Sequence, residues 1–234
     1  MIPPTLNLVW ICDKHPFGEQ EYVCLLTALR HTNLSVVLHT DLKPGESLFC
    51  PYKLLNLDIR QTVFEKETIN GKPVHYIAHA VDWFKINYAY QHGGFWSDLD
   101  IFWLQSLRHL ADQKAVGVYQ SKSYKTAAIG FFGCEPGEPA LEKLRKVWYS
   151  SKTYWKFANL YKFIEPSNWL LLNPPTLFAW RLKQEEFLSN PKFKVNLKNA
   201  LGVHLWGFHY RGRIQFSQTP LQPWFQSLVR IGDI

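Results

Sequence analysis

Residues 6–40 read LNLVWICDKHPFGEQEYVCLLTALRHTNLSVVLHT, and this stretch decides the fold class. Residues 6–12 form a short apolar run bounded by turn-forming residues, which is typical of a buried strand. Residues 19–31 place apolar side chains on one stripe, as in an amphipathic helix, and residues 34–40 form a second apolar run. A strand, a helix and another strand make a parallel βαβ unit, so the chain is predicted to be an α/β protein.

The rest of the chain continues this alternation of strands and helices. A helix is predicted from about residue 79 to 92, because Gly93 and Gly94 favour the left-handed turn that ends a helix. The further predicted elements are strands over 95–103, 115–119, 127–133 and 193–197, and helices over 139–150 and from about 174 to 187. No repeat or linker interrupts this order, so we expect one domain over residues 1–234.

The composition fits a folded domain and excludes several classes of protein. Of the 234 residues, 47% are hydrophobic and 19% are charged, which excludes a disordered chain. The four cysteines form no CxxC pair, which argues against a zinc site or a disulfide scaffold and favours free thiols. No apolar stretch reaches about eighteen residues, and the first residues do not resemble a signal peptide. We therefore expect a cytoplasmic protein.

The net charge indicates an anionic partner. Lys and Arg number 26 and Asp and Glu 19, which gives a formal charge of +7. Nucleic acid, an anionic membrane surface and a phosphorylated small molecule all satisfy this charge, and the net charge alone does not choose among them.

An acidic pair, Asp98 and Asp100, lies in the apolar segment FWSDLDIFW over residues 95–103. On a strand, residues i and i+2 point to the same side, so the two carboxylates would converge while Leu99 faces the core. Two adjacent carboxylates in an apolar setting repel each other unless a cation neutralises them, and oxygen ligands favour Mg²⁺ or Mn²⁺. The alternative is a strand end at the surface that binds no metal.

The surrounding stretch HAVDWFKINYAYQHGGFWSDLDIFWL, residues 79–104, resembles the DXD-containing sugar-binding region of a glycosyltransferase family. That family includes initiating mannosyltransferases, capsule and lipopolysaccharide sugar transferases and the clostridial glucosylating toxins. The matched positions are Asp82, Lys85, Tyr90, Gly93, Gly94, Trp96, Asp98 and Asp100. Val81 stands where the family has Ser, and Lys85 stands where it has Arg, so the bidentate fork of a guanidinium is lost.

The resemblance implies a GT-A-like fold with a Rossmann-like, mostly parallel central sheet flanked by helices. It implies a metal-dependent transferase that uses Mn²⁺ or Mg²⁺ and moves a sugar from a nucleotide diphosphate, UDP above all, with retention of configuration. Asp82 and Lys85 would orient the sugar hydroxyls. The residues expected to be catalytic are Asp82, Lys85, Asp98 and Asp100. Residues 1–135 would form the donor-binding part and residues 136–234 the acceptor or closing part.

Both ends of the chain carry further resemblances. Residues 8–11 resemble the first strand of these enzymes, where Trp10 would stack on uracil, although a buried strand also favours a core Trp. Residues 202–206 resemble a C-terminal VHLW segment whose His, here His204, would be a metal ligand and would favour Mn²⁺ over Mg²⁺. His209 is the reserve, and a core histidine is the alternative. The expected donor-binding residues are Trp10, Asp82, Lys85, Gly94, Trp96, Asp98, Leu99, Trp206 and Arg211.

The expected partners follow from this resemblance and from the charge. They are a nucleotide-sugar donor and a glycan, glycolipid or protein acceptor, as in polysaccharide biosynthesis, with an anionic membrane surface as a peripheral contact. Nucleic acid is the less favoured partner, because Asp98 and Asp100 would oppose it. Two alternatives stay open. One is a catalytically silent relative that binds a nucleotide-sugar or a protein partner, and the other is a basic, aromatic binder of single-stranded nucleic acid.

Overall fold

The structure is a computed structural model of the chain. It describes residues 1–12, 17–45, 51–54, 56–69, 71–121, 126–150, 168–173, 176, 197–205, 219, 221–223 and 225–226. The strand predicted over 193–197 and the helix predicted from 174 to 187 lie almost wholly outside the described residues. So do Trp206, His209 and Arg211.

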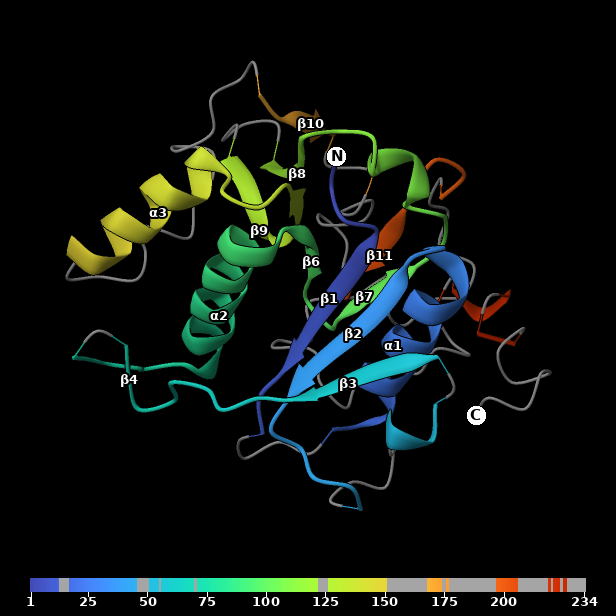
Figure 1. The fold of residues 1–234 in the computed structure, drawn as a ribbon. Coiled ribbons are helices and arrows are strands. Elements are labelled where there is room, and N and C mark those ends of the chain that lie inside the picture. Colours follow the sequence, from blue (N-terminus) through green and yellow to red (C-terminus); the bar gives the residue numbers. More distant parts are fainter. Residues whose placement is uncertain are drawn as a thin grey trace.

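The described chain contains the predicted helices up to residue 150, together with more strands than the sequence predicts, among them three short strands between residues 57 and 73 (Figure 1). The elements are β1 Thr5–Trp10, α1 Glu19–His31, β2 Ser35–Thr40, η1 Pro51–Lys53, β3 Leu57–Gln61, β4 Thr68–Ile69, β5 Lys72–Pro73, α2 Ile77–His92, β6 Gly94–Ser97, β7 Ile101–Trp103, η2 Arg108–Leu110, β8 Ala115–Ser121, β9 Thr126–Cys134, α3 Pro139–Ser150, β10 Leu170–Leu172 and β11 Gly202–His204.

The central sheet is mixed and mostly parallel, in the order β10-β8-β9-β6-β1-β2-β3. Strand β1 pairs in parallel with β2, from Thr5 opposite Ser35 to Trp10 opposite Thr40, and α1 connects the two strands. The predicted βαβ unit is therefore confirmed. Strand β9 is antiparallel to both of its neighbours, and the remaining described pairs of this sheet are parallel. The α/β fold class predicted from the sequence is correct.

Two apolar cores lie on opposite faces of this sheet. Leu6 and Leu8 of β1 pack in one core with residues of α1, whereas Val9 packs in the other with α2 and α3. This alternation follows from the two-residue period of a strand. Figure 1 shows the same arrangement, with α1 on one side of the sheet and α2 and α3 on the other. A strand buried on both faces explains the continuous apolar run in the sequence.

The single strand predicted over residues 95–103 is wrong. It consists of two strands, β6 in the central sheet and β7 in a separate antiparallel pair with β11. Residues 98–100 form the turn between them, in which Leu99 packs into the core and the Asp98 N–H donates to the Gly130 carbonyl at 2.8 Å. The burial of Leu99 and this hydrogen bond hold the turn. The two carboxylates therefore converge through a turn and not through strand alternation.

The described residues bear on two further expectations. Among them, no helix combines the length and the apolar character that crossing a bilayer requires. Cys12, Cys24 and Cys134 are free thiols, as predicted.

Candidate metal centre

Three side chains, Asp98, Asp100 and His204, converge at one end of the sheet. Each offers a ligand atom, and these atoms all lie within 4.8 Å of one another. His204 Nε2 lies 2.9 Å from Asp100 Oδ1 and 3.8 Å from Asp98 Oδ2. Both carboxylates keep some exposure, 30% for the side chain of Asp98 and 21% for that of Asp100, whereas His204 is nearly buried. The cluster therefore has a solvent-accessible side.

Backbone pairing brings these residues together from distant parts of the chain. Strand β11 is antiparallel to β7 with His204 opposite Ile101, and the Leu205 N–H donates to the Asp100 carbonyl at 2.8 Å. Asp98 follows the last residue of β6, which runs parallel to β1. The cluster thus lies at the carboxyl end of these parallel strands, where open α/β sheets bind their ligands.

Lys85 of α2 lies directly behind Asp98. Its side chain has no exposure, and its Nζ donates to Asp98 Oδ1 at 2.5 Å and to the Ile129 carbonyl at 3.1 Å. Asp82, one turn earlier on α2, places its Oδ1 3.1 Å from the same Nζ. The spacing of three residues puts Asp82 and Lys85 on one face of this helix.

These contacts shift the pKa values of Asp98, His204 and Lys85. Burial raises the pKa of Asp98, the Lys85 ammonium opposes this rise, and Asp100 and Asp82 add to it, so the net shift is upward. Burial lowers the pKa of His204, but Asp100 and Asp98 outweigh it and leave the pKa above its ordinary value. Burial also lowers the pKa of Lys85, and the carboxylates of Asp98 and Asp82 reverse this shift, so Lys85 stays charged.

The residues present fit a divalent cation. Two carboxylates and an imidazole are a donor set that Mn²⁺ accepts, whereas Mg²⁺ prefers oxygen alone. The carboxylates of Asp82, Asp98 and Asp100 with the ammonium of Lys85 leave two negative charges when His204 is neutral. A divalent ion would balance that charge in a partly buried site, where an unbalanced charge is costly.

Gly130 is a site residue that the sequence analysis missed. It lies in β9, and its carbonyl accepts the Asp98 N–H. A Cβ at this position would come within 2.9 Å of Asp98 Oδ2 and 3.7 Å of His204 Cε1. Only glycine lets the Asp98 carboxylate lie this close to the strand. A glycine inside an apolar strand is a sequence signal for such a close approach, and it could have found this residue.

Two of the three tryptophans expected to line the donor site, Trp10 and Trp96, lie on opposite faces of the sheet. Trp10, at the carboxyl end of β1, belongs to the core on the α1 side and packs edge-on against Phe17, with ring centroids 5.4 Å apart. Trp96 is fully buried on the α2 side, where it stacks on His39 at 5.5 Å and donates its indole N–H to the Gly93 carbonyl. The structure does not bring Trp96 to the metal cluster.

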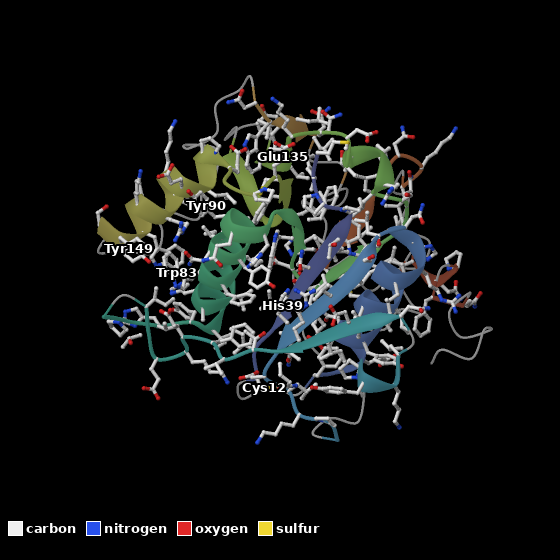
Figure 2. The ribbon with its side chains drawn as sticks, viewed as in Figure 1. Cys12, His39, Trp83, Tyr90, Glu135 and Tyr149 are labelled. Atoms are coloured by element: carbon white, nitrogen blue, oxygen red, sulfur yellow. The ribbon has the colours of Figure 1, made fainter. Side chains whose placement is uncertain are left out.

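His39, which is labelled in Figure 2, stacks its ring on that of Trp96. Its ring also lies against Phe84 and Tyr88 of α2, and its Nε2 lies 3.0 Å from Asn7 Oδ1. Gly94, another expected donor-binding residue, has φ +91°, and a Cβ there would come within 2.9 Å of Asn7 Nδ2. The structure thus gives Gly94 a role in backbone geometry.

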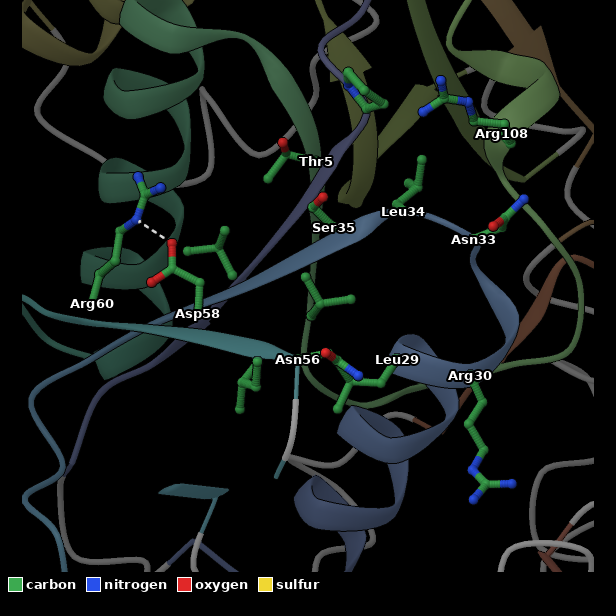
Figure 3. Close-up of a pocket in the computed structure, with 14 residues that line it drawn as sticks. Thr5, Leu29, Arg30, Asn33, Leu34, Ser35, Asn56, Asp58, Arg60 and Arg108 are labelled. Carbon is green, nitrogen blue, oxygen red and sulfur yellow. Dashed lines mark hydrogen bonds and ion pairs between the residues drawn. The ribbon is translucent and has the colours of Figure 1, made fainter. Parts of the chain in front are cut away.

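A separate hollow lies at the other end of the strands (Figure 3). It is lined by the first residues of β1, β2 and β3, among them Thr5, Ser35 and Leu57, and by Arg30 near the end of α1. The Asp58 and Arg60 side chains in this hollow pair with each other at 3.0 Å. No residue of the metal cluster lines it, so the hollow and the cluster are distinct.

Comparison with known proteins gives similarity in structure only. No family model and no curated protein matches the sequence. "PaToxG Glycosyltransferase" is similar over 69% of this chain and 67% of its own, with 13% identity and a TM-score of 0.52. The glycosyltransferase GlyE of Streptococcus pneumoniae TIGR4 is similar over 98% of this chain and 64% of its own, with 10% identity and a TM-score of 0.56.

The apo-form of GlyE is similar over 86% of this chain and 54% of its own, with 11% identity and a TM-score of 0.55. This chain thus spans about half to two thirds of the length of the structures it matches. At identities this low, the similarity indicates a shared fold and does not indicate a shared activity. The protein therefore has the α/β, GT-A-like fold that these glycosyltransferases share, with an Asp-Asp-His cluster at the carboxyl end of its parallel strands.

Proposed function

We propose that this protein is a metal-dependent glycosyltransferase that takes a sugar from a nucleotide diphosphate. The observation that carries the proposal is the convergence of Asp98, Asp100 and His204 at the carboxyl end of the parallel strands. The fold shared with glycosyltransferases supports it, because such a cluster on this fold suits binding of a diphosphate through a divalent cation. The stretch around Asp98 and Asp100, which resembles the DXD-containing region of glycosyltransferases, supports it from the sequence.

The cluster suits the charge changes of sugar transfer. When the bond between the sugar and the diphosphate breaks, negative charge grows on the leaving diphosphate oxygen, and a bound divalent cation stabilises that charge. Asp98 and Asp100 would hold the cation on their exposed side, and His204 would complete the protein's share of its ligands. Mn²⁺ is our first choice because of the imidazole, with Mg²⁺ as the second.

The donor and acceptor remain proposals that rest on the resemblance. We favour a UDP-sugar, with retention of configuration, and a glycan, glycolipid or protein as the acceptor. Asp82 would orient the sugar hydroxyls from behind the cluster. Trp10 lies at the carboxyl end of β1 and is buried there, so it would have to expose a face of its ring to stack on a base. Trp206 and Arg211 complete the proposed donor site.

The test is a screen of UDP-, GDP- and dTDP-sugars for hydrolysis with and without Mn²⁺. We expect Mn²⁺-dependent release of UDP from at least one UDP-sugar, and loss of that release in Asp100→Asn. Asp112→Asn is the matched control, because Asp112 is an exposed aspartate outside the cluster. Release that is equal in Asp100→Asn and in the unchanged protein would contradict the proposal, as would the absence of binding and turnover with every nucleotide sugar.

A further inference from the structure

Lys85 is a buried ammonium group beside the carboxylates of the proposed metal site. Its side chain has 0% exposure, and three oxygens lie within 3.1 Å of its Nζ. They belong to the carboxylates of Asp98 and Asp82 and to the carbonyl of Ile129. An ammonium group has three N–H donors, so three oxygen partners within the protein use its whole capacity.

The geometry points to Lys85 as a positioning residue that fixes Asp98 and balances the charge of the carboxylate cluster before a cation arrives, and that does not contact the donor. This inference rests on the proposed function, since it assigns a role within that site. It differs from the role that the family resemblance implies, in which the basic residue at this position orients the sugar.

The two carboxylate oxygens of Asp98 contact different groups. Oδ1 accepts from Lys85 at 2.5 Å, and Oδ2 faces His204 Nε2 at 3.8 Å and lies close to Gly130. With Oδ1 engaged behind the site, the rotation of the carboxylate is restricted, and Oδ2 stays directed toward the other two ligands. A ligand oriented by a second residue binds its metal more tightly than a free one.

Direct contact between Lys85 and a donor would require its ammonium to leave these partners. Asp82, whose side chain is 8% exposed, would then lose the charge that compensates it, and breaking a buried pair in this way is strongly destabilising.

The first test measures the coupling between Lys85 and Asp98 in metal-free protein. Urea and thermal unfolding are compared for the unchanged protein, Lys85→Met, Asp98→Asn and the double variant, all in EDTA. We expect Lys85→Met to lower Tm by about 10 °C, because it leaves buried carboxylates without a counter-ion. The double variant should be more stable than Lys85→Met alone, since one uncompensated charge is gone.

This cycle remains informative if Lys85→Met does not fold, because a folded double variant would then show the rescue directly. Lys114→Met, at an exposed lysine, is the matched control and should leave Tm within about 2 °C. Lys85→Arg keeps the charge and should retain more stability than Lys85→Met. A double variant no more stable than Lys85→Met would overturn the inference, and so would an arginine that is no better than methionine.

The second test is the rise in Tm that saturating Mn²⁺ produces. We expect a larger rise in Lys85→Met than in the unchanged protein, because the ion then supplies the positive charge that the buried carboxylates lack, and this gain outweighs the weaker orientation of Asp98. If Lys85→Met does not fold alone, Lys85→Arg replaces it and should show the same rise as the unchanged protein. An equal or smaller rise in Lys85→Met, or an altered rise in Lys85→Arg, would overturn the inference.

Failure of the proposed function would give a result that differs from failure of the role inferred for Lys85. If Mn²⁺ does not stabilise the unchanged protein, the metal site fails, while the metal-free cycle still decides whether Lys85 fixes Asp98.

Discussion

The imidazole of His204 and the carboxylate of Asp100 meet at 2.9 Å, although the two residues come from distant parts of the chain. The meeting is set by the backbone, because β11 pairs with β7 immediately after the turn that carries Asp100. The contact makes His204 the third potential ligand of a site that the sequence motif alone defines by two carboxylates. His204 also favours Mn²⁺ over Mg²⁺ as the ion.

Replacement of His204 is therefore expected to weaken Mn²⁺ binding more than Mg²⁺ binding. In His204→Ala we expect affinity for Mn²⁺ to fall at least about tenfold, since even residues that only orient a ligand matter that much. Calorimetric titration of each ion measures the effect. His109→Ala, at an exposed histidine, is the matched control and should change neither affinity. Equal Mn²⁺ affinity in His204→Ala and His109→Ala would rule out His204 as a ligand.

Gly130→Ala is expected to disturb the site from the neighbouring strand. Its Cβ would lie 2.9 Å from Asp98 Oδ2, so the carboxylate must move away from its present position. We expect Mn²⁺ affinity to fall about tenfold, as for other changes that misplace a ligand. The helical content in circular dichroism should stay as it is. Unchanged Mn²⁺ affinity in a folded Gly130→Ala protein would mean that the position of Asp98 is not critical.

Trp96→Phe separates a core role from a donor-binding role. Trp96 is fully buried and donates a hydrogen bond to the Gly93 carbonyl, so we expect a loss of about 1–3 kcal/mol in unfolding free energy. Affinity for UDP in the presence of Mn²⁺ should remain within about twofold, a difference below 0.5 kcal/mol. Denaturant unfolding and UDP titration together test both parts. Weaker UDP binding with full stability would restore Trp96 to the donor site.

His39 is expected to make stability depend on pH. Burial, with Arg60 nearby, lowers the pKa of His39 from 6.5 to about 4 in the folded protein. Between these values the unfolded chain holds a proton that the folded protein does not, so stability falls as the pH falls from 6.5 toward 4. The loss amounts to about 3 kcal/mol when complete.

Urea unfolding of the unchanged protein and of His39→Gln at several pH values checks this prediction. His39→Gln should have lower stability at pH 7 and a flatter pH dependence between 6.5 and 4. Other groups titrate in both proteins, so the difference between the two slopes reports on His39. Parallel curves for the two proteins would show that His39 is protonated equally in the folded and unfolded states.

The sequence predicts the main architecture because short patterns of apolar residues determine most of its strands and helices. Residues 6–40 contain the apolar runs and helical stripe of a βαβ unit, and the helix predicted over 139–150 matches α3. The break between β6 and β7 is not visible in FWSDLDIFW, because the segment is apolar on both sides of the acidic pair. Only the pairing of β7 with the distant β11 separates the two strands. The division into donor and acceptor parts at about residue 135 stays a prediction.

The site was predictable to the extent that its residues lie close together in sequence. The spacing of Asp98 and Asp100 identifies them as a candidate metal-binding pair. Asp82 and Lys85 lie three residues apart on a predicted helix, which places them on one face. The engagement of all three Lys85 donors was not predictable, because it depends on the Ile129 carbonyl from another strand. The close approach of Gly130 also depends on tertiary structure, so the sequence suggests a special glycine there but not its partner.

The most direct test of the central claim is a titration of Mn²⁺ into the protein, followed by electron paramagnetic resonance of the free ion. We expect one Mn²⁺ per chain in the unchanged protein, tighter binding when UDP is present, and at least about tenfold weaker binding in Asp100→Asn. Asp112→Asn should bind as the unchanged protein does. No saturable Mn²⁺ binding, or identical binding in Asp100→Asn and Asp112→Asn, would contradict the claim that Asp98, Asp100 and His204 form the metal site of a nucleotide-sugar enzyme.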